Sequence, residues 1–353
     1  MNEQFTHIVN PRSADIPVDP LAWLSTLGGP ASLFIQGADT ERTRAVVTLL
    51  HGNEPSGMFA IHRLLREGLE PATNLLLVLV SVEAALLEPL FRYRAYPSER
   101  DMNRSFNPPY SDCAGRIAKQ LLQLLEEHKP EAVLDVHNTS GKSPSFAVST
   151  QQSWPHESLA AIFTERLVIT QLRMGSLMEQ SKPEMPVLTV ECGGAQEQSA
   201  HDLAYRGLLE YFTCKQLFHV EHGLDMDIYH DPVRLELEQG LRLAFASSPV
   251  LGVDMTLLDQ VDQFNFRPVP PGTLLGWVRS PDVLDRLRLA DAKGNNRFDQ
   301  FFELCGNKLQ TNAPQKLFMV TTRPDIALSD CLLYSAVESE HERVHLEPEA
   351  NGA

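Results

Sequence analysis

The sequence has few positive charges for its size, and this deficit limits the partners it can have. Lysine and arginine number 30 against 46 aspartate and glutamate residues, which gives a formal net charge of -16. An acidic chain does not bind nucleic acid or an anionic membrane surface through its overall charge. We therefore expect neither a nucleic acid nor a membrane as a partner.

Cysteine is also scarce, and no long apolar run is present. The cysteines form an odd set with no C-x-x-C pair, namely Cys113, Cys192, Cys214, Cys305 and Cys331. Such a set fits a reducing compartment better than a disulfide framework. The N-terminal residues lack the basic and apolar regions of a signal peptide, and no later run is long enough to span a bilayer. We expect a cytoplasmic protein.

The first two thirds of the chain alternate between apolar runs and amphipathic stretches. With 353 residues and 43% hydrophobic content, the chain can bury a large core, and its length suggests two domains. Strand-like runs occur at residues 45–50, 74–81, 132–136 and 187–190, and helical spacing at 58–69, 113–128 and 199–217. This alternation predicts an α/β fold in which helices cover a sheet.

The pattern changes after about residue 221. Residues 233–237 alternate like a half-exposed strand, and a Pro- and Gly-rich break at 268–272 precedes another apolar run at 273–278. Short strands separated by turns predict a smaller β-rich domain. We place an α/β domain at 1–224, a β-rich domain at 225–345 and a frayed tail at 346–353.

Three of the strand-like runs are followed by residues that can bind a metal ion or move a proton. The segment HGNE at 51–54 follows the first run, so that His51 and Glu54 lie three positions apart; His137 follows the second run and Glu191 the third. In an open, mostly parallel sheet the ligand crevice lies outside the carboxyl ends of the strands. Two imidazoles, one carboxylate and an open position for water are the pattern of a catalytic zinc site.

Each of these residues has a simpler interpretation when it is taken alone. An H-x-x-E spacing arises by chance in loops, and a single histidine such as His137 is more often a core residue bonded to a neighbouring strand. Glu191 alone could cap a helix or form a surface salt bridge. Beside a metal, however, Glu191 could take a proton from bound water and pass it to a leaving amine. Asp135 lies two residues before His137, hence on the same side of a strand, where a carboxylate orients a ligating imidazole.

The segment DMNR at 101–104 is a further candidate element. Arg104 offers a planar fork suited to a carboxylate, and Asn103 adds a donor beside it. Unusually for so acidic a chain, more arginines lie just upstream, at Arg92, Arg94 and Arg100. This local excess of positive charge favours the binding of an anion.

Taken in order, these motifs resemble those of the succinylglutamate desuccinylase/aspartoacylase family, which is related to the zinc carboxypeptidases. The family pattern of H-x-x-E, D-L-N-R, D-x-H-N-T and a strand-terminal E followed by G is matched at 51–54, 101–104, 135–139 and 191–193. The resemblance covers about residues 40 to 215. It implies a zinc carboxypeptidase-like fold, with a mixed, mostly parallel sheet flanked by helices and a smaller β-rich C-terminal domain.

The resemblance also implies a role for each matched residue. His51, Glu54 and His137 would hold one Zn²⁺ per chain, and Glu191 would be the general base and acid. Arg94 would polarise the scissile carbonyl, with Arg100 as the alternative because the spacing departs from the family's. Asn103 and Arg104 would bind a substrate carboxylate. Asp135 and Asn138 would support the metal ligands. Aspartoacylases carry another substrate-binding arginine before the catalytic glutamate, where this chain has SKPE at 181–184.

The resulting hypothesis is a zinc-dependent amidohydrolase that removes an N-acyl group from an amino acid or a similar small amide. Its substrate would be an N-acyl amino acid or a short peptide with a carboxylate. One alternative is a zinc carboxypeptidase acting on a peptide or cell-wall fragment, for which the C-terminal domain would have to leave the cleft open. A second is a non-catalytic zinc-binding protein, which would have no need of Glu191. The sequence does not identify the acyl group, the amino acid or the oligomeric state. A homo-oligomer is one of the states left open.

Overall fold

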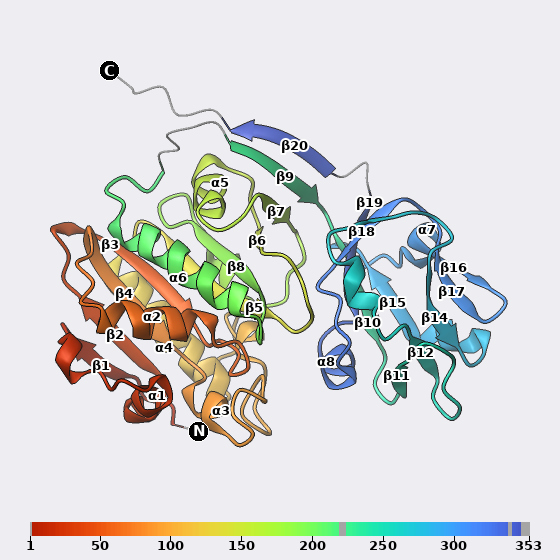
Figure 1. Ribbon diagram of the computed structural model, residues 1–353, viewed down its shortest axis with the longest axis horizontal. Coiled ribbons are helices and arrows are strands. Elements are labelled where there is room, and N and C mark those ends of the chain that lie inside the picture. The colour runs from red at the N-terminus through yellow and green to blue at the C-terminus, as the bar shows by residue number, and fades with distance from the viewer. Residues whose placement is uncertain (1, 219–223, 338–340, 347–353) are drawn as a thin grey trace.

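The computed structural model describes residues 2–218, 224–337 and 341–346, and its largest element is a mixed ten-stranded sheet (Figure 1). The strand order is β1-β2-β4-β3-β5-β8-β6-β7-β9-β20. Neighbouring strands are parallel except in the pairs β2–β4, β8–β6 and β9–β20. The strands are β1 (Thr6–Val9), β2 (Ala31–Ile35), β3 (Asp39–Thr48), β4 (Thr73–Leu79), β5 (Val133–Thr139), β6 (Phe146–Ser149), β7 (Arg166–Ile169), β8 (Val187–Gly194), β9 (Leu224–His230) and β20 (His341–Leu346).

Helices cover both faces of the large sheet, as the alternation of sequence patterns predicts. Alternate residues of one strand face opposite ways, so Val46 of β3 packs in the core beneath α2 and α6, whereas Val47 packs in the core beneath α4. The central strands are buried on both sides, which explains why they read as continuous apolar runs. The helices of this part are α1 (Pro20–Leu27), α2 (Ser56–Arg66), α3 (Val82–Leu86), α4 (Cys113–His128), α5 (Trp154–Ala161) and α6 (Gln198–Thr213).

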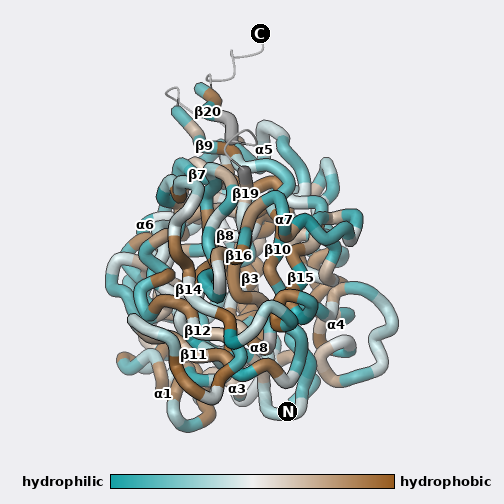
Figure 2. Tube along the Cα trace, turned by 90° about the vertical axis from the view of Figure 1, so that its right-hand side faces the viewer, coloured by the Kyte–Doolittle hydropathy of each residue, from teal (hydrophilic) through white to brown (hydrophobic). Residues whose placement is uncertain are grey.

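The C-terminal part holds two smaller sheets around a core of its own. In Figure 2 strand β14 is largely apolar, and many outer turns are polar. One sheet has the order β13-β18-β19-β10-β15 and the other β11-β12-β14-β17-β16. Their elements are β10 (Val233–Leu237), β11 (Leu243–Phe245), β12 (Met255–Leu257), β13 (Pro268–Val269), β14 (Leu274–Val278), β15 (Leu287–Ala290), α7 (Phe298–Phe301), β16 (Phe302–Cys305), β17 (Lys308–Thr311), β18 (Gln315–Phe318), α8 (Pro324–Ser329) and β19 (Leu333–Val337).

An aromatic cluster joins the two parts. Phe146 of β6 lies 4.9 Å from Phe266, and Tyr229 of β9 lies 5.5 Å from the same ring, measured between ring centroids. Phe318 of β18 packs into the same cluster. Burial of these rings fixes the C-terminal part against the β6–β7–β9 side of the large sheet.

The predicted fold class is confirmed, with differences in detail. Strands β5 and β8 continue past Val136 and Val190, where the apolar runs end, because their last residues still pair with each other. Strands β9 and β20 pair with the large sheet, although the sequence assigns both to the β-rich part. The division of the chain at 224/225 stays a prediction, and all but residue 346 of the predicted tail lies outside the described residues.

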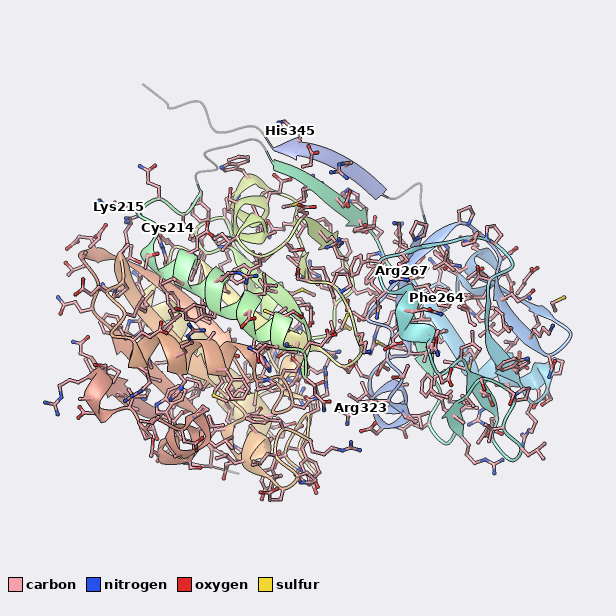
Figure 3. All side chains as sticks on the ribbon, viewed as in Figure 1. Cys214, Lys215, Phe264, Arg267, Arg323 and His345 are labelled. Atoms are coloured by element: carbon pink, nitrogen blue, oxygen red, sulfur yellow. The ribbon has the colours of Figure 1, made fainter. Side chains whose placement is uncertain are left out.

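The structure also bears on the expectations about the cysteines and about membrane-spanning segments. All five cysteines carry free thiols. Cys214, next to the end of α6, lies far from Phe264 of the C-terminal part (Figure 3). None of the helices in the described ranges combines the length and the apolar character needed to cross a lipid bilayer.

Substitution of Gly57 tests how closely α2 packs on β3 and β5, the strands that lead to His51 and His137. A Cβ atom at residue 57 would lie 2.3 Å from Oγ1 of Thr48 and 3.1 Å from Cγ1 of Val136. Gly→Ala inside a helix ordinarily stabilises by about 0.5–1 kcal/mol. Here we expect Gly57→Ala to lower the free energy of unfolding by about 1–3 kcal/mol, because the helix must move off the sheet. Urea denaturation with EDTA present measures this, and a gain in stability would contradict the packing described.

Candidate active site

Three predicted metal ligands come together at the carboxyl end of β3 and β5. One ligand atom from each of His51, Glu54 and His137 lies within 4.8 Å of the other two, and this is the one such group found in the described residues. The three residues are only 3%, 5% and 3% exposed. His51 and Glu54 follow β3 in a tight turn, where the N–H of Glu54 donates to the carbonyl of His51. Gly52 lets this turn pack closely against α3, because a Cβ there would lie 2.7 Å from the backbone nitrogen of Ala85.

Both imidazoles point the same nitrogen at Glu54. Nδ1 of His51 lies 2.9 Å from Oε1 of Glu54, and Nδ1 of His137 lies 2.6 Å from Oε2. The carboxylate of Glu54 is therefore shared between two rings whose Nδ1 atoms converge. Two nitrogen donors and a carboxylate oxygen form a donor set that suits zinc.

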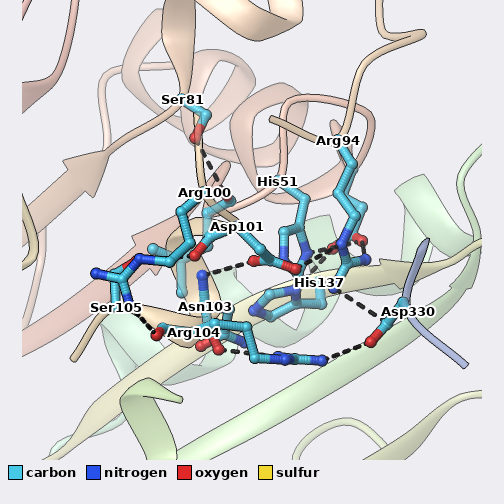
Figure 4. Close-up of polar contacts among 12 residues, drawn as sticks. His51, Ser81, Arg94, Arg100, Asp101, Asn103, Arg104, Ser105, His137 and Asp330 are labelled. Carbon is cyan, nitrogen blue, oxygen red and sulfur yellow. Dashed lines mark hydrogen bonds and ion pairs between the residues drawn. The ribbon is translucent and has the colours of Figure 1, made fainter. Parts of the chain in front are cut away.

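The other ring nitrogens are each backed by an aspartate. Nε2 of His51 lies 3.0 Å from Oδ1 of Asp101 (Figure 4). Nε2 of His137 lies 2.9 Å from Oδ1 of Asp135, although this ion-pair contact lacks the alignment of a hydrogen bond. A carboxylate behind Nε2 holds the proton there and leaves Nδ1 for a metal, which is the usual arrangement behind ligating histidines.

The electrostatics of this group depend on opposing effects. Burial opposes protonation of His51 and His137, but the surrounding carboxylates outweigh it and raise the pKa of both imidazoles. Burial likewise disfavours the charged form of Glu54, yet the two imidazoles lower its pKa. A buried carboxylate that is held ionised requires positive charge next to it, whether from two protons or from a metal ion.

Glu191 lies beside this group, and one of its two carboxylate oxygens lacks a hydrogen-bond partner in the described part of the chain. It is the register partner of His137 across the β5–β8 pair, and it is 6% exposed. Its Oε2 atom is buried without a hydrogen bond among the described residues. Burial raises the pKa of Glu191 to about 7, with a smaller contribution from Glu54 and an opposing one from His137. A carboxylate with this pKa can both accept and return a proton near neutral pH.

Asn138 hydrogen-bonds to Glu54 and to the segments next to the other site residues, a position in line with its place in the motif. Its backbone N–H donates to Oε2 of Glu54, and its side-chain Oδ1 accepts from the backbone N–H of Ser56. Its Nδ2 donates to the carbonyl of Gly193 and to Oγ of Ser56, which also bonds Nδ1 of His201. These contacts tie together the segments that carry Glu54, His137 and Glu191.

Arg94 lies at the site, whereas Arg100 does not line the cavity. Nε of Arg94 donates to Oδ2 of Asp101 at 2.8 Å, and its NH1 lies 3.5 Å from Oε1 of Glu54. Arg100 instead pairs with Asp112 and donates to the carbonyl of Arg104. Of the two alternatives, Arg94 is the one positioned to reach a group bound at the histidines.

Asn103 and Arg104 also line the cavity, but Arg104 already has an anionic partner. Oδ1 of Asn103 accepts from the backbone N–H of Leu177, which fixes the orientation of its amide. NH2 of Arg104 donates to Oδ1 of Asp330 at 2.7 Å (Figure 4). Asp330, just after α8 in the C-terminal part, therefore reaches the site from the other half of the molecule.

The cavity around these groups is built by both parts of the chain. The large sheet and its loops contribute the charged residues together with apolar ones such as Phe146 and Met174, and the C-terminal part contributes further apolar and polar side chains. The latter include Pro232, Phe318, Met319, Ile326, Asp330 and Tyr334. The C-terminal part therefore covers the cleft.

Two residues of this site were not assigned such roles from the sequence. Asp101 was identified only as part of the DMNR motif, and its position ahead of Asn103 gives no sign that it would back His51. Asp330 lies in a segment with no recognisable motif, and 226 positions separate it from Arg104. Only the folded chain shows that these two carboxylates meet the arginines.

Comparison with solved structures supports the fold. Murine aminoacylase 3 superposes with a TM-score of 0.56 at 17% identity, covering 88% of this chain and 98% of that one. The succinylglutamate desuccinylase/aspartoacylase from Rhodobacter sphaeroides gives 0.54 at 13% identity, covering 89% and 88%. The succinylglutamate desuccinylase from Chromobacterium violaceum gives 0.52 at 16% identity, covering 85% of each chain. At these identities the likeness concerns the fold alone.

Sequence comparison matches one segment of the chain to a family model. No curated protein sequence matches the chain. Residues 40–209, however, match the family model of the succinylglutamate desuccinylase/aspartoacylase catalytic domain. This segment contains His51, Glu54, His137 and Glu191, the residues whose order and spacing first suggested the resemblance. Residues 40–209 therefore match the catalytic domain of the succinylglutamate desuccinylase/aspartoacylase family, which confirms the resemblance drawn from the motifs.

Proposed function

We propose that the protein is a zinc-dependent amidohydrolase that removes the acyl group from an N-acylated amino acid or a similar small amide. The observation that carries this proposal is Oε2 of Glu191, which is buried without a hydrogen bond from any described residue beside the His51, Glu54 and His137 group. A proton acceptor next to a metal-binding group is what hydrolysis of an amide requires. The family assignment supports the same reaction class.

The residues present fit a zinc ion. His51 and His137 would ligate through Nδ1 and Glu54 through a carboxylate oxygen, because these atoms already converge and the Nε2 atoms face aspartates. Three protein ligands leave a position open, as catalytic zinc sites do. When bound, zinc would supply Lewis-acid polarisation of the scissile carbonyl and would make a nearby water more acidic.

The remaining chemistry belongs to side chains of the protein. Glu191 accepts a proton from the attacking water and returns it to the leaving amine, since its raised pKa lies near neutral pH. Arg94 donates to the carbonyl oxygen as negative charge develops there. Asp101 keeps the guanidinium of Arg94 in place through the 2.8 Å hydrogen bond from Nε.

The covered cavity favours a deacylase over a carboxypeptidase. A longer peptide or cell-wall fragment needs an open cleft, but residues of the C-terminal part such as Phe318 and Tyr334 line the cavity. A small N-acyl amino acid suits such a half-closed site. The free thiols support the proposed location in a reducing compartment, the cytoplasm.

A non-catalytic zinc-binding role is the second alternative. A protein that only binds zinc has no use for an additional buried, unpartnered carboxylate, because such a group costs stability. Glu191 is such a carboxylate. Its presence favours an enzyme.

Removal of a predicted ligand should remove the metal. We expect purified protein to hold about one zinc ion per chain, and His51→Ala or His137→Ala to hold almost none after dialysis, because two remaining ligands bind weakly. Inductively coupled plasma mass spectrometry measures the stoichiometry. His7→Gln, an exposed histidine outside the cavity, is the control and should keep its zinc. Full zinc content in both alanine variants would contradict the assigned ligands.

Substitution of Glu191 separates an enzyme from a zinc binder. Glu191→Gln keeps the size and polarity of the side chain but cannot accept a proton, so amide hydrolysis should fall by about 10²- to 10⁴-fold. Zinc content and melting temperature should stay near those of the unaltered protein. Loss of zinc in Glu191→Gln would instead indicate a ligand, and full activity would refute the mechanism.

The pH dependence of hydrolysis should report the same carboxylate. Glu191 acts as a base only when it is deprotonated, so kcat/KM should fall as pH drops through its pKa. Burial raises that pKa to about 7, and a bound dication would lower it, so the acid limb should lie at or below about pH 7. Initial rates across a buffer series measure this limb. A kcat/KM that rises steadily on acidification would exclude Glu191 as the base.

A further inference from the structure

The carboxylate of Asp330 contacts three arginine side chains at once. Its Oδ1 accepts from Arg104 and from Arg234, each at 2.7 Å, and its Oδ2 lies 3.3 Å from NH2 of Arg94. The side chain is 10% exposed. Figure 4 shows the carboxylate of Asp330 between the guanidinium groups of Arg94 and Arg104.

Asp330 is ionised in this position. Burial disfavours its charged form, but Arg94, Arg104 and Arg234 outweigh burial and lower the pKa of Asp330 to about 2. The three arginines around Asp330, Arg94, Arg104 and Arg234, are matched by three carboxylates, Asp330 itself, Asp101 beside Arg94 and Glu236 beside Arg234. These charges cancel, so the cavity offers no excess positive charge to a carboxylate that arrives at Arg104.

A substrate carboxylate could bind Arg104 only by displacing Asp330. That displacement would leave a carboxylate without its partners in a half-closed cavity, which is strongly unfavourable. Arg234 opposes the movement as well, because its NH2 also donates to the backbone carbonyl of Asp330. The subsite at Arg104 is therefore filled by the chain itself.

The rest of the cavity wall is mostly apolar, with uncharged polar side chains such as Thr139, Thr170 and Ser176 among the apolar ones. Side chains from β6, β7 and the neighbouring loops, together with C-terminal residues, form this surface, which includes Phe146, Val148, Val168, Met174, Met178 and Tyr334. Within the described residues, Arg94 and Arg104 are the arginines that line it. Lys182, in the segment where aspartoacylases carry another arginine, is exposed and does not line the cavity.

We propose that the carboxylate of Asp330 fills the position at Arg104 where a substrate carboxylate would otherwise bind. The protein then selects amides that carry an apolar group at Arg104, and not a second carboxylate. This inference rests on the proposed amidohydrolase function and narrows its substrate class. It departs from the sequence-based expectation that Arg104 binds a substrate carboxylate. Asp330 is then a specificity-determining residue supplied by the C-terminal part.

Binding of two small acids tests this without turnover. Succinate and butanoate have the same chain length and differ by one carboxylate, so isothermal titration of the zinc-loaded protein compares them directly. We expect the two Kd values to agree within about threefold in the unaltered protein, since Arg104 is not available to the second carboxylate. In Asp330→Asn, succinate should bind at least about tenfold more tightly while butanoate is unchanged, because a charge-assisted hydrogen bond becomes available.

Matched variants identify the cause of any change. Asp325→Asn removes an exposed carboxylate of α8, which pairs with the half-buried Arg323 outside the cavity, and it should leave both Kd values unchanged. Asp330→Glu keeps the charge and should keep the two acids nearly equal. If the unaltered protein binds succinate at least about tenfold more tightly than butanoate, Asp330 yields to substrate and the proposal is wrong, whatever the variants do.

Turnover gives an independent second arm. The ratio of kcat/KM for N-acetyl-L-leucine to that for N-acetyl-L-aspartate should exceed about ten in the unaltered protein and should fall in Asp330→Asn. A preference of the unaltered protein for N-acetyl-L-aspartate would overturn the proposal. If neither compound is hydrolysed but the succinate and butanoate result holds, the proposed reaction fails while the role of Asp330 stands.

Discussion

The carboxylate of Glu54, buried between two imidazoles, is the interaction on which the site depends. It is removed from water together with Asp135 and Glu191, with Asp101 half-buried beside them, and burial of so many carboxylates is unfavourable unless positive charge accompanies them. Arg94 supplies part of that charge. The convergence of two Nδ1 atoms on Glu54 provides a place for the rest, either as protons or as a divalent cation.

The sheet explains why these groups meet. β3 and β5 are adjacent and parallel, so His51 and His137 emerge at the same edge, and β8 lies next to β5 with Glu191 level with His137. Backbone pairing, which is rigid and buried, thus sets the spacing of the side chains. The C-terminal part closes the cavity through the aromatic cluster around Phe266 and brings Asp330 to the arginines. The α/β part therefore holds the candidate metal ligands and Glu191, and the C-terminal part limits the space in the cavity beside them.

Much of this arrangement could be predicted from local pattern. Buried parallel strands read as unbroken apolar runs, and His51 and Glu54 are joined by a short turn, so their proximity follows from spacing. Helix α4 was predicted at its observed bounds because its apolar face is regular. The ends of α2 and α6 differ by a few residues, since apolar side chains beyond a helix end, such as Leu69 and Leu217, still pack on the core.

Contacts between distant segments could not be predicted in the same way. The continuation of β5 and β8 through His137 and Glu191 depends on pairing between strands, which single-strand composition does not encode. The ion pair of Arg104 with Asp330 depends on how the C-terminal sheets dock, and acidic residues are common throughout this chain. A carboxylate that fills a binding subsite from another part of the molecule carries no sequence signature.

The coordination sphere of the bound metal tests the central claim most directly. X-ray absorption spectroscopy at the zinc edge distinguishes nitrogen and oxygen ligands from sulfur by distance. We predict two imidazole nitrogens and carboxylate or water oxygens at about 2.0–2.2 Å, from His51, His137 and Glu54. A shell with sulfur at about 2.3 Å, or one without imidazole scattering, would show that zinc binds elsewhere and would contradict the proposed site.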